Sequence, residues 1–159
     1  MEGCIYQLNL SDGGVPKTPV ADARVTLTGL VGDRQRYTKI HGGPQRALCL
    51  YSLERIEALR EEGHPIFPGS VGENVTVAGL DWNLVKPGVR LALGEEVLIE
   101  ITSYVTPCKT IAASFAKRDW HRIRQEKHPG DARLYARVLH TGRLAVGQSV
   151  RLADTHEAA

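Results

Sequence analysis

The chain has 159 residues, a length that favours one domain with a sizeable hydrophobic core. Its formal net charge at pH 7 is +2, and basic residues alternate with acidic ones, so the charge gives no indication of nucleic-acid binding. The cysteines Cys4, Cys49 and Cys108 are too few and too scattered for a disulfide framework, and no pair has the spacing of zinc ligands.

The start of the chain, M-E-G-C-I-Y, lacks the basic and apolar regions of a signal peptide, and no apolar run reaches the length of a membrane span. We therefore expect a soluble cytoplasmic protein from a reducing compartment. We expect residues 1–153 to form a single domain and residues 154–159 to be a frayed tail.

Alternating apolar residues predict two strands near the start of the chain. In the first, Gly3–Leu10, we expect Ile5 on one face and Tyr6 and Leu8 on the other. The second is predicted over Ala23–Leu30, after a loop rich in turn residues.

The segment Gly32–Gln45 is dense in basic residues and glycine, and two interpretations stay open. It is either a solvated surface loop, as most charge-rich loops are, or an anion-binding loop. In the second case glycines let backbone amides approach an oxyanion while cationic side chains supply charge. The residues concerned are Gly42 and Gly43 for the amides, and Arg34, Lys39, His41 and Arg46 for the charge.

A buried strand and a helix are predicted next. Arg46–Tyr51 reads as the strand, which makes Cys49 a core residue. Ser52 is suited to cap the helix Leu53–Glu62, which should end at Gly63.

The glycine-rich segment Phe67–Asn74 precedes a short strand, Val75–Ala78. No Lys-Ser/Thr pair follows its glycines, which argues against a Walker-type phosphate loop. Glu73 and Asn74 are interpreted as turn residues.

Most of the remaining predicted elements are strands. They are the hairpin strands Val89–Leu93 and Val97–Ile101, helices over Lys109–Lys117 and Asp119–Glu126, and the strands Leu134–Leu139 and Ser149–Leu152. Because strands outnumber helices and the spacings are short, we predict a mainly β domain. A closed or partly closed barrel with a few peripheral helices would leave few exposed sheet edges.

The stretch Ser103–Thr110 has the composition of a site that activates a cysteine. Thr106 is predicted to cap a helix with Pro107 at its first position, which places Cys108 and Lys109 in the first turn. The helix dipole and the lysine ammonium would both favour the thiolate, the form that attacks electrophiles and binds soft metals. The alternative is a buried, inert cysteine.

Taken together and in order, several segments make the chain resemble the MOSC domain family, named after the C-terminal part of molybdenum-cofactor sulfurases. Each motif is weak alone, but the ordered set covers nearly the whole chain. The motifs are G-L-V-G-D-R-Q (29–35), H-G-G-P-Q-R-A (41–47), P-G-S-V-G-E-N (68–74), P-C-K (107–109) and Y-A-R-V-L-H-T-G-R-L-A-V-G-Q (135–148).

The resemblance implies a MOSC-type, pyruvate-kinase-like β-barrel in a stand-alone member of the family, and binding of the molybdenum cofactor (Mo-molybdopterin). Cys108 matches the single cysteine that ligates the metal in the family, and is therefore also the predicted catalytic residue. The residues expected to hold the cofactor are Lys17, Arg34, His41, Gly42, Gly43, Arg46, Asn74 and Thr106. The sequence departs from the family pattern at Val105-Thr106, where a basic residue is common, and at Gly147-Gln148, where Gly-Asp is usual.

The resemblance implies three alternative functions. The first is reduction of N-hydroxylated compounds, such as hydroxylaminopurines and amidoximes, with electrons from a separate flavin or iron-sulfur protein. The second is sulfur transfer through a Cys108 persulfide supplied by a pyridoxal-phosphate-dependent cysteine desulfurase. The third is non-catalytic carriage of the cofactor. All three need a reactive Cys108, and the basic loop favours the two that bind the cofactor.

Overall fold

The structure is a computed structural model that describes residues 2–34 and 43–154. His41 and Gly42, both predicted to hold the cofactor, lie outside the described residues, as does the predicted tail apart from Asp154. Within the described ranges, no helix has both the length and the apolar character needed to cross a membrane.

The structure is mainly β, as predicted. Its strands are β1 (Glu2–Leu10), β2 (Thr18–Val20), β3 (Asp22–Thr26), β4 (Gly29–Leu30), β5 (Leu48–Ser52), β6 (Val75–Ala78), β7 (Arg90–Leu93), β8 (Val97–Tyr104), β9 (Leu134–His140), β10 (Gly142–Ala145) and β11 (Ser149–Ala153). Its helical elements are α2 (Leu53–Glu61) and the 3-10 turns η1 (Pro44–Arg46), η2 (Trp82–Leu84), η3 (Lys109–Ser114), η4 (Ala116–Arg118) and η5 (Trp120–Ile123).

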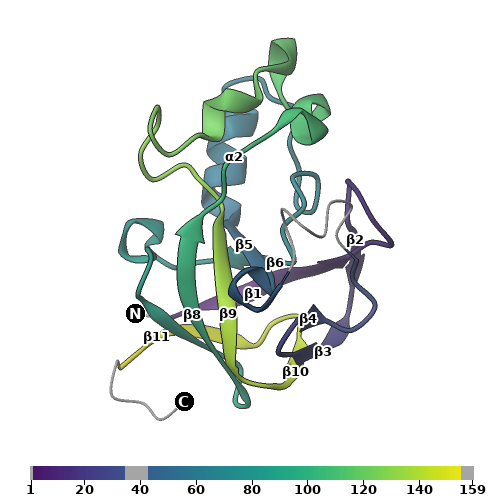
Figure 1. Ribbon diagram of the computed structural model, residues 1–159. Coiled ribbons are helices and arrows are strands. Elements are labelled where there is room, and N and C mark those ends of the chain that lie inside the picture. The colour runs from purple at the N-terminus through teal and green to yellow at the C-terminus, as the bar shows by residue number, and fades with distance from the viewer. Residues whose placement is uncertain (1, 35–42, 155–159) are drawn as a thin grey trace.

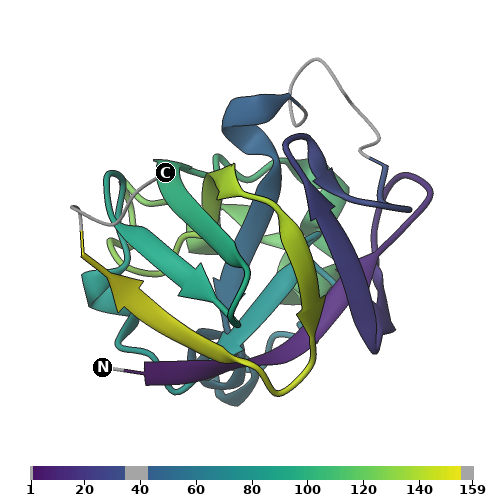
Figure 2. The same ribbon diagram turned by 90° about the horizontal axis from the view of Figure 1, so that it is seen from below.

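Seven strands close into a barrel in the order β11-β7-β8-β9-β5-β6-β1, and β1 pairs back with β11. Figure 2 shows β1 and β11 side by side at this closure. Closure leaves no open edge between these seven strands. The barrel prediction is therefore confirmed. The core contains fully buried residues from most of the barrel strands, including Leu8, Leu50, Val75, Leu91, Ile99, Leu134 and Val150.

The helix α2 connects the one parallel pair among the described barrel strands, β5 and β6. A parallel pair needs such a crossover, because a tight turn can join only antiparallel strands. The Ser52 hydroxyl caps the helix by accepting from Arg55 N, as predicted. At the other end, Gly63 N bonds Arg60 O and His64 N bonds Leu59 O, so the helix ends as the sequence indicated.

The predicted faces of the first strand were wrong. Ile5 and Leu8 are both buried in the barrel, and Tyr6 is 48% exposed. The register between β1 and β6 shifts between Ile5 and Gln7, a bulge that inserts an extra residue. A bulge moves the following side chains to the opposite face, which strict alternation cannot anticipate.

The single strand predicted over Ala23–Leu30 is instead two strands, β3 and β4, joined by a tight turn. In this turn Thr26 Oγ1 accepts from Thr28 N and donates to Gly29 O. The hydroxyl thus satisfies backbone groups where the chain reverses. With β10, these strands form a small second sheet.

The helices predicted after the cysteine are also wrong, because the chain forms the 3-10 turns η3, η4 and η5 there. Phe115 is extended (φ −125°, ψ 138°) and ends η3. Its ring packs edge-on against His64 at 5.4 Å, and Ala116 N donates to His64 Nδ1 at 3.0 Å. These contacts hold the 3-10 turns beside α2 at one end of the barrel (Figure 1).

Candidate functional site

Cys108 lies in the segment that leaves β8. Val105 N, at its start, donates to Arg133 O at 3.0 Å, which anchors the segment beside β9. Cys108 is extended (φ −138°, ψ 173°) and flanks η3 without a side-chain cap bond, so it is not in a helical first turn as predicted. Its half-buried thiol sulfur lies 2.9 Å from Thr110 Oγ1. A hydroxyl at this distance can donate to a thiolate and stabilise it.

Tyr135 lies beside two other candidate groups, Cys49 and Arg46. It lies opposite Cys49 in the β5–β9 ladder and opposite Ser103 in the β8–β9 ladder. The Arg46 guanidinium lies 5.5 Å from the centre of its ring, within cation–π distance. Burial raises the pKa of the Tyr135 phenol, and the Cys49 and Cys108 thiols raise it further. Tyr135 thus has Cys49 as its strand partner and the Arg46 guanidinium at its ring.

Cys49 and Cys108 differ in their surroundings. Cys49 is buried with Val105 and Tyr135 in a small cluster, as the predicted core strand implied. Burial raises the pKa of the Cys49 thiol to about 11, so this thiol is protonated at neutral pH. Of these two cysteines, Cys108 is therefore the better candidate for a thiolate ligand.

A buried hydrogen-bonded network lies on the other side of Cys49. Lys17 Nζ contacts Asp33 Oδ1 at 2.5 Å, with the two side chains only 3% and 7% exposed. Asn74 Nδ2 donates to Asp33 Oδ2 at 2.9 Å, and Asn74 Oδ1 accepts from Cys49 N at 3.1 Å. Lys17 and Asn74 are thus engaged with protein groups, and their predicted contact with a cofactor stays a prediction.

Glu73 and Asn74, which were interpreted as turn residues, are both fully buried. Glu73 Oε2 accepts from Gly69 N and Thr76 Oγ1, each at 3.0 Å. Burial raises the pKa of the Glu73 carboxyl despite these bonds. Glu73 Oε1 and Arg133 Nε are buried without a hydrogen-bond partner among the described residues.

The remaining predicted cofactor residues lie nearer the surface. The Arg34 side chain is 71% exposed and lies 3.9 Å from Asp12. Gly43 is exposed and has φ 95° and ψ 168°, a conformation that only glycine adopts readily. Thr106 is exposed and does not cap a helix. The chain from Gly43 into η1 positions Arg46 over Tyr135.

An apolar pocket of about 170 Å³ adjoins Cys108. Thr110 lines this pocket and also contacts the Cys108 sulfur. The lining comes from three segments: Val15 and Pro16, Phe67 and Ser70, and Thr110, Ile111, Ala113 and Ser114.

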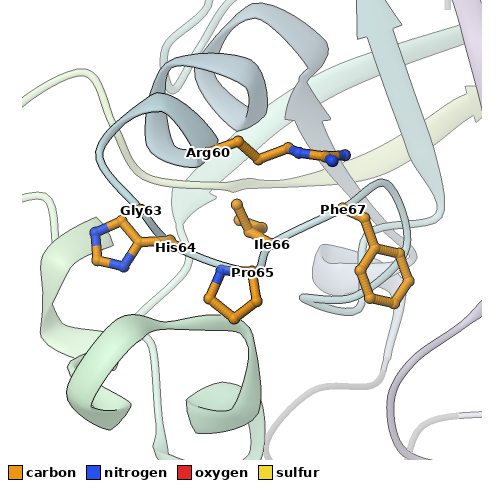
Figure 3. A pocket seen from close by; sticks show the side chains of 6 residues that line it. All are labelled: Arg60, Gly63, His64, Pro65, Ile66 and Phe67. Atoms are coloured by element: carbon orange, nitrogen blue, oxygen red, sulfur yellow. The ribbon is translucent and has the colours of Figure 1, made fainter.

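A second pocket, of about 270 Å³, lies below the end of α2. Figure 3 shows the Arg60 side chain crossing above the loop that carries His64 and Phe67, with these two rings at opposite ends of the view. None of the predicted site residues that the structure describes lines it. Across residues 2–34 and 43–154, no three His, Cys, Asp or Glu side chains gather in a group that would hold a metal ion.

Three residues of the candidate site were missed from the sequence: Asp33, Thr110 and Tyr135. Asp33 lies within the G-L-V-G-D-R-Q motif (29–35), in which only the neighbouring Arg34 was predicted to hold the cofactor. Thr110 carries a hydroxyl close in sequence to the cysteine, which is a usable signal. Tyr135 begins the motif at 135–148, but that motif does not indicate its neighbours, because only the strand register places it beside Cys49.

The chain belongs to the MOSC domain family, which it matches over residues 37–151. It is 30% identical to the Bacillus subtilis (strain 168) protein YflK, in an alignment that covers 96% of this chain and 74% of YflK. It is 29% identical to a protein named Reductase from Gibberella moniliformis (strain M3125 / FGSC 7600), where the alignment covers 81% of this chain but only 23% of the fungal protein.

A solved structure with the same fold is that of YiiM from Geobacillus stearothermophilus. The TM-score is 0.71 at 25% sequence identity, and the match covers 96% of this chain and 75% of that chain. This similarity agrees with the closed barrel described above.

Proposed function

We propose that this protein binds the molybdenum cofactor through Cys108 and reduces N-hydroxylated compounds. Membership of the MOSC domain family supports an association with this cofactor, and the relative named Reductase supports a reductive reaction. The observation that carries the proposal is the half-buried Cys108 thiol, whose sulfur lies 2.9 Å from the hydroxyl of Thr110, a residue that also lines an apolar pocket.

The donors around Cys108 suit the cofactor. A thiolate is the soft ligand that the metal needs, and the Thr110 hydroxyl is placed to stabilise that thiolate. Arg46 and Arg34 are exposed cations on either side of residues 35–42, and cations of this kind bind a phosphate. Lys17, Asp33 and Asn74 would position the surrounding loops from within the core.

When bound, the cofactor would supply the two-electron chemistry of the reaction. Overall, the N–O bond breaks and the N–OH group takes up two electrons and two protons to give the N–H product and water. The electrons come from a separate donor protein that carries a flavin or an iron-sulfur centre. The chain itself would hold the thiolate at Cys108, screen it from water and orient the substrate.

Turnover by cofactor-loaded protein tests the proposal. The protein is produced in a host that makes the cofactor, and benzamide oxime and hydroxylaminopurine are supplied with reduced methyl viologen as the electron donor. We expect benzamidine or adenine as the product, and no product with Cys108→Ala. Absence of turnover by protein that carries near-stoichiometric cofactor would contradict the proposal. Persulfide formed at Cys108 by a cysteine desulfurase in metal-free protein would then favour sulfur transfer.

A further inference from the structure

We infer that the apolar pocket beside Cys108 is the substrate subsite, and that it selects N-hydroxylated compounds whose organic part is a single uncharged ring. This inference rests on the proposed function. It concerns the pocket lined by Val15, Pro16, Phe67, Ser70, Thr110, Ile111, Ala113 and Ser114.

The pocket is joined to the thiol by one side chain. Thr110 forms part of its wall, and the Thr110 hydroxyl lies 2.9 Å from Cys108 Sγ. A substrate whose reacting group lies at Cys108 would therefore have its organic part beside this pocket. Catalysis needs the reacting atoms to be held close together, and an adjoining subsite provides such positioning.

The wall of the pocket is mainly apolar, and the hydroxyl groups of Ser70 and Ser114 in it already make hydrogen bonds within the protein. Ser70 Oγ accepts from Phe67 N at 3.0 Å, and Ser114 Oγ donates to Ser70 O at 3.4 Å. Among the described residues that line the pocket, none carries a charged side chain. A charged substituent would lose its hydration here without gaining a partner, whereas an apolar ring gains by leaving water.

The size of the pocket fits one ring. Its volume is about 170 Å³, and a cavity of about 150 Å³ with an apolar wall is known to accept benzene. A purine has two fused rings and several hydrogen-bonding nitrogens that this wall would leave without partners. Benzamide oxime therefore fits the pocket better than a hydroxylaminopurine does.

The wall is also held in place by close backbone contacts. Gly69 has φ +89°, and an added Cβ would lie 2.5 Å from Lys17 O, so only glycine lets these two loops approach so closely. Lys17 N donates to Gly69 O at 2.9 Å. These contacts fix Val15 and Pro16 opposite Phe67 and η3, so the subsite is largely formed before a ligand binds.

Two changes at the pocket test the inference. Ala113 is exposed at the pocket wall, so Ala113→Phe should fill the pocket without disturbing the core. Phe67, 45% exposed, forms part of the opposite wall, and Phe67→Ala removes that part. Ala21→Phe is the matched control, because Ala21 is exposed and does not line the pocket.

The first measurement is binding to metal-free protein. We expect benzamide oxime to shift the NMR methyl resonances of Val15 and Ile111, and acetamide oxime and 4-carboxybenzamide oxime to leave them unchanged at the same concentration. The shifts should disappear in Ala113→Phe, weaken in Phe67→Ala and persist in Ala21→Phe. Absence of shifts in the unmodified protein, or shifts confined to the Arg60–Phe67 pocket, would overturn the inference.

The second measurement is turnover by cofactor-loaded protein. Ala113→Phe should raise the KM for benzamide oxime at least about tenfold, as a misfit in an apolar subsite does, and leave acetamide oxime almost unaffected. Equal KM values in Ala113→Phe and Ala21→Phe would overturn the subsite while the reductase proposal stands. If the methyl resonances shift but the protein reduces no N-hydroxylated compound, the conclusion that the pocket binds a ring stands and the reductase proposal is contradicted.

Discussion

Thr110 Oγ1 lies 2.9 Å from Cys108 Sγ, a distance at which the Thr110 hydroxyl can stabilise a thiolate at this cysteine. We predict that Thr110→Val slows the alkylation of Cys108 by iodoacetamide roughly three- to tenfold, because one hydrogen bond to the thiolate is lost. The rate is measured in a Cys4→Ser background, since Cys4 is also half-buried. Thr110→Ser should retain most of the rate, and an unchanged rate in Thr110→Val would contradict this role.

The buried pair of Lys17 and Asp33 should contribute strongly to stability. In Asp33→Asn the Lys17 ammonium stays buried without its counterion, and we predict a loss of about 3–5 kcal/mol in the free energy of unfolding. Urea denaturation measures this loss. Asp12→Asn is the control, because the Asp12–Arg34 pair is long and exposed and its loss should cost less than about 0.5 kcal/mol. Similar losses of unfolding free energy in Asp33→Asn and Asp12→Asn would contradict the prediction that the buried pair contributes more to stability than the exposed pair.

The carboxylate of Glu100 should make stability depend on pH. Glu100 pairs with Arg90 on β7 and Arg137 on β9, and the hydrogen bond from Arg90 is the largest cause that lowers its pKa. Because the folded-state pKa of Glu100 is lowered, its carboxylate stabilises the protein at pH values above the unfolded-state pKa. This stabilisation is lost as the pH falls through the folded-state pKa.

We therefore predict that Glu100→Gln costs about 1 kcal/mol at pH 7, and that the difference from the unmodified protein shrinks as the pH falls below 4.5. Urea denaturation of both proteins at a series of pH values measures this difference in the free energy of unfolding. Glu95→Gln, at an exposed turn position, should show no such trend. A cost that stays constant down to pH 3 would mean that the carboxylate charge is not responsible.

Arg46 should contribute to cofactor retention through its charge. We predict that Arg46→Ala lowers the molybdenum content of purified protein several-fold while the fold stays intact, because a phosphate loses a cationic partner. Arg60→Ala, which removes an exposed arginine from the end of α2, serves as the control. Equal molybdenum content in the two variants would instead support the interpretation of this loop as a solvated surface.

The sequence predicted the features that depend on local pattern. The capped helix after Ser52, the β7–β8 hairpin and the buried strand around Cys49 follow from periodicity and turn residues, and all three are confirmed. The bulge after Ile5 could not be predicted, because it arises from pairing with β6. The 3-10 turns after Cys108 depend on His64, which is distant in sequence.

The same distinction applies to the candidate site. The P-C-K motif identified Cys108, but its surroundings come from separate strands and loops. Tyr135 reaches Cys49 only through the register of β5 and β9, and Asp33 reaches Lys17 only when their two loops meet. Buried polar partners of this kind leave no periodic pattern in a sequence.

The molybdenum content of the cysteine variants tests the central claim most directly. Unmodified protein and Cys49→Ala, purified from a host that makes the cofactor, should each carry close to one molybdenum per chain, although Cys49→Ala should lose about 1 kcal/mol or somewhat more of stability. Cys108→Ala should fold normally, as circular dichroism would show, and carry only background metal. Equal molybdenum content in unmodified protein and Cys108→Ala would contradict the claim that Cys108 binds the metal.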